Sequence, residues 1–225
     1  MRDARPRVAS VCMEVENLEP RVFLLSPASL LGLRAQQLTS PRARFGAAER
    51  YRSPEGVTVE EAFSFMSSLY FRGKITYARR FASPPAGLAE VGSAGVLVIA
   101  PGFGLVPPDW RITPERMRKL RRTPVDLKSR AYCAPLRGHA LELQSVLAPL
   151  APETKVVLLG SIATGKYVDV LLPVFGDRLI FPRDFVGAGD MRRGALLLRA
   201  ARAGEELEYA TLDIPRSLAA RRVKG

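Results

Sequence analysis

Short runs of consecutive apolar residues alternate along the chain with stretches in which apolar residues recur every three or four positions. Three of these runs, residues 22–25 (VFLL), 95–100 (GVLVIA) and 155–160 (KVVLLG), are typical of buried strands that stop at a turn. A fourth strand is predicted at residues 178–182 (RLIFP). Residues 195–212 fit either two strands or a helix followed by a strand, and periodicity does not decide between them.

Helical spacing is clearest from Thr58 onward. Thr58 and Glu61 have the spacing of a capping box, and apolar residues follow at helical intervals up to residue 82. We expect Gly73 to divide this region into two helices. Another helix is predicted after Thr113, which can cap it, with Pro114 in its first turn.

Two more helices are predicted between the later strands. Residues 137–150 place apolar side chains on one face, and a short helix after Lys166 is expected to close at Pro173 and Gly176. Apolar strands that alternate with helices indicate a parallel sheet covered on both faces. The predicted fold is an α/β, Rossmann-like three-layer sandwich with a mostly parallel central sheet.

We expect this fold to form one domain. Residues 1–20 lack a sustained period and are predicted to be a tail or arm, residues 21–215 a single α/β domain, and residues 216–225 a basic C-terminal tail. The apolar runs are far shorter than the roughly 20 residues of a membrane span, and the N-terminus lacks the apolar core of a secretory signal. A cytoplasmic location without membrane association is therefore expected.

The composition of the chain excludes several kinds of site and favours one class of partner. Cys12, Cys133 and the single histidine, His139, fit neither a disulfide framework, a metal site nor a Ser-His triad. No metal is predicted, and the sequence indicates no cofactor or oligomeric state. The 34 Lys and Arg residues against 22 Asp and Glu give a net charge of +12, which favours polyanions and nucleic acid above all. Most of the basic residues are arginine, however, and GC-rich coding produces the same bias.

The loops after the first three strands are built from small residues. They are residues 26–29 (SPAS), 101–104 (PGFG) and 160–166 (GSIATGK). Loops at the carboxyl ends of parallel strands converge on one crevice, where ligands of such sheets bind. Gly and Ser there allow close approach to an anion, although the same residues also make ordinary strand-to-helix turns.

The third loop differs by one letter from the P-loop pattern G-x-x-x-x-G-K-[ST], because Tyr167 stands where Ser or Thr is required. A tyrosine cannot place a short-stemmed hydroxyl on Mg²⁺, and the next predicted strand does not end in the Asp that would hold the metal. Nucleoside triphosphate hydrolysis is therefore not expected. Ser161, Thr164 and Lys166 at a helix N-terminus remain candidates for binding phosphate.

Two further stretches suggest contacts to nucleic acid. Residues 67–80 interleave aromatic and basic side chains, which suits base stacking and phosphate pairing, with a half-buried helix as the alternative. Residues 182–194 combine glycines, carboxylates and arginines in one loop. The candidate phosphate- or nucleic-acid-binding residues are Ser26, Ser29, Tyr70, Arg72, Lys74, Gly104, Ser161, Thr164, Lys166, Arg192 and Arg193.

A catalytic acid or base would have to be a carboxylate on a loop at the same edge of the sheet, because no useful histidine is present. Asp109 follows the second strand, and Asp190 belongs to the glycine-rich loop after the fourth. These two residues are the predicted catalytic candidates. Each could instead be a turn-forming Asp beside Pro or Gly.

The blocks FLLSPAS, SSLYFRGKITYARRFA, VLVIAPGFGLVPPDWRITP and VVLLGSIATGKYVDVLLP span about two thirds of the chain. Their order resembles the YaaA-like families and the domains found beside archaeosine-type tRNA modification enzymes. The resemblance implies a nucleobase-glycosylase-like α/β architecture, and a role in DNA binding or base modification. Gly104, Leu105, Pro108 and Asp109 correspond to the GL-x-x-PD block of such families. The first loop lacks the water-activating Asp of uracil-glycosylase-type proteins, which argues against that activity here.

The first functional hypothesis is a nucleic-acid- or nucleotide-binding α/β protein, with action on a nucleobase left open. The alternative is a non-catalytic domain that binds an unidentified partner and whose charge is compositional. A third interpretation is a degenerate P-loop nucleotide-binding protein.

Overall fold

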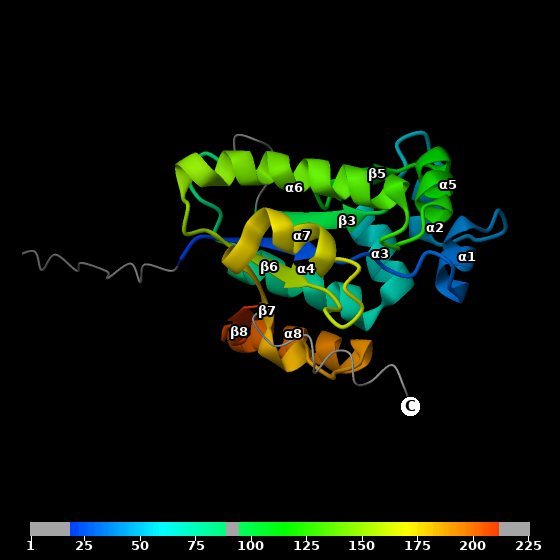
Figure 1. Ribbon diagram of the computed structural model, residues 1–225. Coiled ribbons are helices and arrows are strands. Elements are labelled where there is room, and N and C mark those ends of the chain that lie inside the picture. Colours follow the sequence, from blue (N-terminus) through cyan, green and yellow to red (C-terminus); the bar gives the residue numbers. More distant parts are fainter. Residues whose placement is uncertain (1–18, 89–94, 212–225) are drawn as a thin grey trace, which may run out of the picture.

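The computed structural model describes residues 19–88 and 95–211 (Figure 1). The predicted tails, 216–225 and 1–20 except for residues 19 and 20, lie outside the described residues. The strands are β1 (Arg21–Leu25), β2 (Val57–Thr58), β3 (Val96–Ala100), β4 (Gly104–Val106), β5 (Arg111–Ile112), β6 (Lys155–Leu159), β7 (Leu179–Pro182) and β8 (Tyr209–Thr211). The helices are α1 (Leu33–Thr39), α2 (Gly46–Arg52), α3 (Val59–Ser67), α4 (Leu69–Phe81), α5 (Pro114–Arg122), α6 (Arg130–Leu150), α7 (Val168–Phe175) and α8 (Asp190–Ala203).

Within the described residues, six strands form one sheet in the order β4-β3-β1-β6-β7-β8. β1 pairs in parallel with β3 and β6, and β7 continues the parallel arrangement beside β6. β4 and β8 are antiparallel at the two edges, and β2 and β5 form a separate two-stranded ribbon. The prediction of an α/β fold with a mostly parallel sheet is confirmed.

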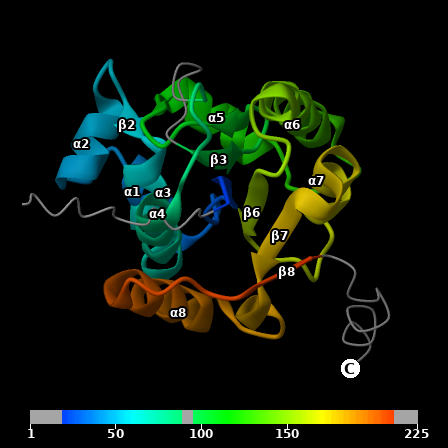
Figure 2. The same ribbon diagram turned by 90° about the vertical axis from the view of Figure 1, so that its left-hand side faces the viewer.

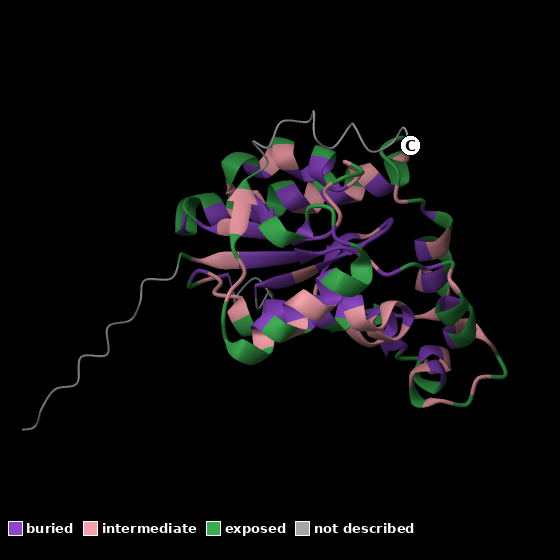
Figure 3. Cartoon of the chain, turned by 90° about the horizontal axis from the view of Figure 1, so that it is seen from below, coloured by how far each residue is buried: buried purple, intermediate pink, exposed green. Residues whose placement is uncertain are grey.

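Residues of β1 face opposite sides of the sheet in alternation and divide the core in two. Phe23 and Leu25 pack in a cluster with α3, α4 and α8, whereas Val22 and Leu24 pack in a second cluster with α6 and α7. Figure 2 shows α4 and α8 on one side of the strands and α6 and α7 on the other. Apart from their first residues Arg21 and Lys155 and the half-buried Leu97, the parallel strands β1, β3, β6 and β7 are buried (Figure 3), which explains their runs of consecutive apolar residues.

The predicted strands at 22–25, 95–100, 155–160 and 178–182 are confirmed as β1, β3, β6 and β7. Of the two alternatives for residues 195–212, the helix followed by a strand is correct, because α8 precedes the edge strand β8. The cap predicted at Thr113 is also present, since its Oγ1 accepts a hydrogen bond from the Arg116 N–H.

The prediction that Gly73 divides the long helical region is wrong. Thr58 caps α3 by accepting a hydrogen bond from the Glu61 N–H at 3.2 Å, as the capping box requires. The break falls at Ser68, with φ 51° and ψ −116°, the one non-glycine residue with positive φ in the described ranges. Gly73 lies inside α4, where a Cβ would stand 2.7 Å from the carbonyl oxygen of Gly194. Its role is therefore close helix packing.

Two other expectations are corrected. The PGFG loop after β3 turns back into β4 and not into a helix, because Gly102 and Gly104 adopt φ of 82° and 81° and allow a tight reversal. α6 begins at Arg130, seven residues before the predicted start at 137, and contains Pro135. Burial of Tyr132 and Leu136 against the sheet offsets the backbone hydrogen bond that this proline removes.

Candidate functional site

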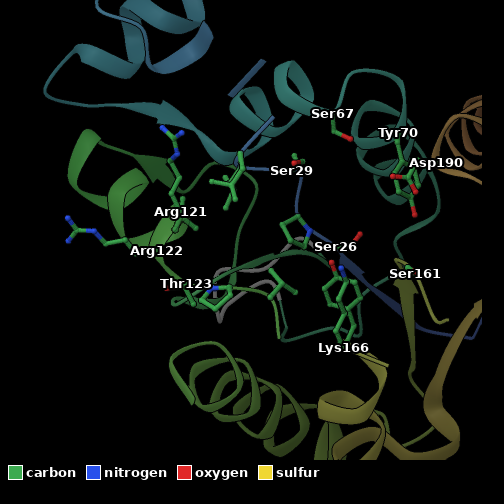
Figure 4. A pocket seen from close by; sticks show the side chains of 18 residues that line it. Ser26, Ser29, Ser67, Tyr70, Arg121, Arg122, Thr123, Ser161, Lys166 and Asp190 are labelled. Atoms are coloured by element: carbon green, nitrogen blue, oxygen red, sulfur yellow. The ribbon is translucent and has the colours of Figure 1, made fainter. Parts of the chain in front are cut away.

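A cavity of about 640 Å³ opens at the carboxyl ends of β1 and β6. Its walls come from the loops after these two strands, the start of α4, the end of α5 and the start of α8 (Figure 4). The loops 26–29 and 160–166 therefore converge, as predicted. Loop 101–104 does not line the cavity. It lies behind the wall, where a Cβ on Gly102 would stand 2.7 Å from Thr123 Oγ1.

Lys74 is fully buried next to this cavity and contacts the first residue after β1. Its Nζ donates a hydrogen bond to the Ser26 carbonyl oxygen at 2.5 Å and lies 2.9 Å from Ser26 Oγ. The ring centroids of Tyr70 and Phe71 are 4.4 and 5.0 Å from the same nitrogen. Among the described residues no carboxylate forms an ion pair with Lys74. All of the direct partners of this lysine are therefore neutral.

Burial lowers the pKa of Lys74 to about 7, because the charged form loses its hydration. The carboxylate of Asp190 raises this pKa, and the guanidinium of Arg193 lowers it. A lysine with a pKa near neutrality exists in part as the free amine, which can accept a proton.

The position of Lys74 follows from the crossing of α4 and α8. Gly73 and Gly194 meet at this crossing, and a Cβ on Gly194 would stand 2.9 Å from the Leu69 carbonyl oxygen and the Tyr70 Cα. Ser68, in its strained backbone conformation, ends α3 and lets α4 start at a new angle. Such strain costs about 1–3 kcal/mol and is common beside functional sites. Together these features place the first turns of α4 close to the end of β1.

Two buried tyrosines approach Ser26. The Tyr70 hydroxyl lies near the side chains of Ser26 and Arg193, but makes no hydrogen bond of normal geometry with any described residue. Burial raises the pKa of Tyr70 to about 12. Burial also raises the pKa of Tyr167, and the neighbouring Tyr70 adds to this effect. Both phenols keep their protons at neutral pH and can act as hydrogen-bond donors.

Asp190 and Arg193 occupy the first turn of α8 and have different roles. Asp190 lines the cavity with a side chain that is 71% exposed. Arg193 is buried, and its Nε and Nη2 donate to the Phe185 carbonyl oxygen at 3.3 and 3.0 Å. Its Nη1 lies 3.5 Å from Asp190 Oδ1. Arg193 therefore fixes the loop before α8, and Asp190 is the member of the pair that lines the cavity.

Three cationic side chains line the cavity. Arg121 and Arg122, at the end of α5, stand at one side, with Tyr70 and Asp190 at the other, and the end of the Arg122 side chain points away from Ser26 and Lys166 (Figure 4). Arg121 Nη1 donates to Thr39 Oγ1 at 3.4 Å, whereas Arg122 is exposed and pairs with no acid in the described part of the chain. Lys166 belongs to the loop after β6, and its Nζ lies 5.5 Å from the Tyr167 ring centroid.

The geometry of loop 160–167 differs from that of a phosphate-binding P-loop. Gly165 has φ 67°, and a Cβ there would stand 2.9 Å from Asp169 Oδ2. A carboxylate thus lies beside Gly165, and its negative charge would repel a phosphate bound at that point of the loop. Tyr167 is buried in the core cluster of α6 and α7. The tyrosine that breaks the motif is therefore a packing residue.

The structure brings several of the predicted site residues together and separates the others. The candidates that line the cavity are Ser26, Ser29, Tyr70, Ser161, Lys166 and Asp190, with Lys74 directly behind Ser26. The candidates outside its lining are Arg72, Gly104, Asp109, Thr164, Arg192 and Arg193. Asp109 is exposed in the turn closed by the hydrogen bond from Trp110 N to Pro107 O. Gly104 faces α6, where a Cβ would stand 2.9 Å from His139 Nδ1.

Sequence reasoning missed the direct contact between Lys74 and Ser26, since it treated Lys74 as an exposed partner for phosphate. A signal was present, because Tyr70, Lys74 and Tyr77 recur at the spacing of one helix face, and the structure buries all three. The contribution of Arg121 and Arg122 was also missed. Nothing in the local sequence indicates that the end of α5 takes the place of the PGFG loop.

In the described ranges, no three His, Cys, Asp or Glu side chains are grouped so that they could hold a metal ion. None of the described helices has the length and apolar character needed to cross a membrane. The chain matches no protein-family model, and neither the curated proteins nor the solved structures contain a significant match to it.

Proposed function

We propose that the chain is a Rossmann-like three-layer protein of the cytoplasm that binds nucleic acid or a nucleotide in the cavity at the carboxyl edge of its sheet. The observation that carries this proposal is the charge of the cavity. Arg121, Arg122 and Lys166 line it, and among the described lining residues Asp190 is the one carboxylate. Since Asp190 already pairs with Arg193, the cavity favours an anionic ligand.

The size of the cavity and the surface beside it support the same ligand class. About 640 Å³ falls within the roughly 300–1,000 Å³ of small-molecule sites. Outside the cavity, α5 extends the positive surface, where Arg116 and Lys119 stack on Trp110 and Phe103 at 4.8 and 4.3 Å. Basic residues at a helix C-terminus also stabilise the helix dipole. That effect accounts for the place of Arg121 and Arg122 in the last turn of α5 but not for their position around a cavity.

A salt titration tests this function. Binding of labelled single- and double-stranded DNA and RNA oligonucleotides is measured by fluorescence anisotropy, and binding of mononucleotides by calorimetry. We expect log affinity to fall linearly with log salt. In the double variant Arg121→Ala/Arg122→Ala the slope should become shallower by about 1–2, since each lost phosphate contact removes about one counterion.

Arg199→Ala is the matched control, because Arg199 is exposed on α8 and does not line the cavity. Its slope should equal that of the unmodified protein. Two results contradict the proposal: absence of binding at low salt, or an equal slope in the double variant and the control. Binding of oligonucleotides without mononucleotides would identify the ligand as nucleic acid, and the reverse would identify a free nucleotide.

A further inference from the structure

We propose that Ser26 and Lys74 form a nucleophile and general-base pair that cleaves a carboxylic ester held in the cavity. This activity goes beyond the proposed binding function. The chemistry of the Ser26–Lys74 pair does not depend on that binding function. Serine and lysine serve together in this way on several unrelated folds, so the arrangement is recognised by its geometry and not by a sequence motif.

The geometry meets the requirements of proton transfer. Ser26 is the first residue after the central strand β1 and lines the cavity. Its Oγ is 2.9 Å from Lys74 Nζ, within the roughly 2.6–3.2 Å that a general base needs. One N–H of Lys74 is held by the Ser26 carbonyl oxygen at 2.5 Å. In the neutral amine the lone pair is then free to accept the proton of the Ser26 hydroxyl.

A purely structural role explains this lysine poorly. Burying an ammonium group beside neutral partners is unfavourable, and an apolar side chain of the same length would fill the space between Tyr70 and Phe71 without that penalty. The Tyr70 hydroxyl is a second, independent observation. It belongs to a side chain that is 6% exposed, lines the cavity and has no hydrogen-bond partner among the described residues. A donor left unpaired at this position suits an oxygen that gains negative charge during the reaction.

The reaction has two balanced steps. Ser26 Oγ attacks the carbonyl carbon of the ester and passes its proton to Lys74 Nζ, while the Tyr70 hydroxyl donates to the carbonyl oxygen. The bond to the leaving alcohol breaks, and that alcohol takes the proton from Lys74. Water then attacks the Ser26 ester and gives a proton to Lys74, and Ser26 recovers it as the acid departs. The sum is ester plus water to acid plus alcohol.

The cavity also constrains the rest of the substrate. Arg121, Arg122 and Lys166 favour an ester that carries an anionic group such as a phosphate. This part of the inference rests on the proposed function, whereas the reaction at Ser26 does not.

The rate should depend on pH through Lys74. The charged and titratable groups that face it are Asp190 and Arg193 from α8, Tyr70 from its own helix, and Tyr167 through their shared neighbour Ser26. Since burial lowers the pKa of Lys74 to about 7, acylation of Ser26 should accelerate as the pH rises through this value and level off above it. The tyrosine pKa values are raised, so the phenols do not ionise in this interval.

The test uses p-nitrophenyl acetate, a small activated ester that needs no anionic group. The full-length protein is mixed with the ester, quenched with acid and digested, and acetyl groups are located by mass spectrometry. We expect acetylation of Ser26 that depends on pH as described. Lys74→Met should slow it by a factor of about 100 or more, with folding checked by circular dichroism. Lys128→Met, at an exposed position outside the cavity, is the matched control and should react normally.

Three results would overturn the proposal: no acetyl group on Ser26 in the folded protein, acetylation of Lys74 in its place, or an unchanged rate in Lys74→Met. The result of this acetylation test can be distinguished from the result of the binding test. Because the ester lacks phosphate, Ser26 acetylation without oligonucleotide binding would refute the binding function alone. Binding without acetylation would refute the Ser26–Lys74 pair alone.

Discussion

Both faces of the six-stranded sheet are covered by helices. The buried polar groups differ between regions of the core in whether they have hydrogen-bond partners. On the face of α6 and α7, the buried Tyr132 hydroxyl donates to the Lys166 carbonyl oxygen at 2.9 Å, and Nδ1 of the half-buried His139 lies 2.9 Å from the Leu105 carbonyl oxygen.

On the face of α4 and α8 the buried Tyr77 hydroxyl also has partners, since it lies 2.8 Å from the Tyr209 hydroxyl and accepts from the Leu207 N–H. Beside the cavity, however, Lys74 is buried among neutral groups and the Tyr70 hydroxyl has no partner among the described residues.

This difference separates the satisfied parts of the core from the region beside the cavity, where we propose that the chemistry takes place. Satisfied polar groups add stability, whereas unpaired or charged groups in a low-dielectric site oppose folding. They are retained where a ligand or a reaction uses them. The strained Ser68 and the glycine contact between α4 and α8 belong to the same face. We therefore expect identical substitutions on the α6 and α7 face and in the part of α4 and α8 around the cavity to have opposite effects.

The largest contrast should come from adding one methyl group to a helical glycine on each face. Gly194→Ala would bring a Cβ to within 2.9 Å of backbone atoms of α4, so the helices must move apart. We expect a loss of about 3 kcal/mol in the free energy of unfolding. Gly138→Ala on α6 meets nothing within 4 Å and should gain about 0.5–1 kcal/mol from helix propensity. Urea denaturation of both variants measures the two changes in the free energy of unfolding. The expected contrast is contradicted if both substitutions stabilise the protein or both destabilise it.

A smaller effect is expected from Lys74→Met, and its size should depend on pH. The pKa of Lys74 is about 7 in the folded protein and near its ordinary value of 10.5 when unfolded. Below pH 7 both states hold the proton, so the folded state bears the full penalty of the buried charge. Between these two pKa values the unfolded state binds more protons. The unmodified protein therefore gains stability as the pH rises, by at most about 1.4 kcal/mol per unit.

The Met variant lacks this titration and should be more stable than the unmodified protein by about 2 kcal/mol at pH 6. The difference should shrink steadily toward pH 9. Denaturation of both proteins in parallel cancels the titration of all other groups. A constant difference across this interval would mean that Lys74 titrates normally, and the contrast between the two faces would then lose its electrostatic part.

The sequence predicted most of the fold because its strands and helices are local patterns. Continuous apolar runs marked β1, β3, β6 and β7, and the capping residues marked the starts of α3 and α5. The break at Ser68 could not be predicted, because a tertiary contact between two helices places Gly73 inside α4 and moves the interruption upstream. The hairpin after β3 was not predicted, because glycines permit both a hairpin and a strand-to-helix turn.

The candidate site was predicted in part. The rule that parallel strands deliver their loops to one edge placed Ser26, Ser161 and Lys166 together correctly. It could not reveal that Lys74 reaches Ser26 across 48 residues of sequence, or that the end of α5 completes the wall. The resemblance of loop 160–167 to a P-loop could not show the position of Asp169 beside Gly165, because a motif records residue types and not the contacts of the folded loop.

The smallest expected contrast compares two buried tyrosines, one on each face, that lose only their hydroxyl groups. Tyr132→Phe removes the hydrogen bond to the Lys166 carbonyl oxygen and should destabilise the protein by about 1 kcal/mol. Tyr70→Phe removes a buried hydroxyl that has no partner among the described residues and should stabilise it by about 1 kcal/mol, because the desolvation penalty disappears. Urea denaturation without ligand measures both changes. The same Tyr70 variant should acetylate Ser26 more slowly with p-nitrophenyl acetate, since the donor to the developing oxyanion is lost. Tyr70→Phe that destabilises the protein and leaves acetylation unchanged would show that this hydroxyl serves packing, as on the opposite face.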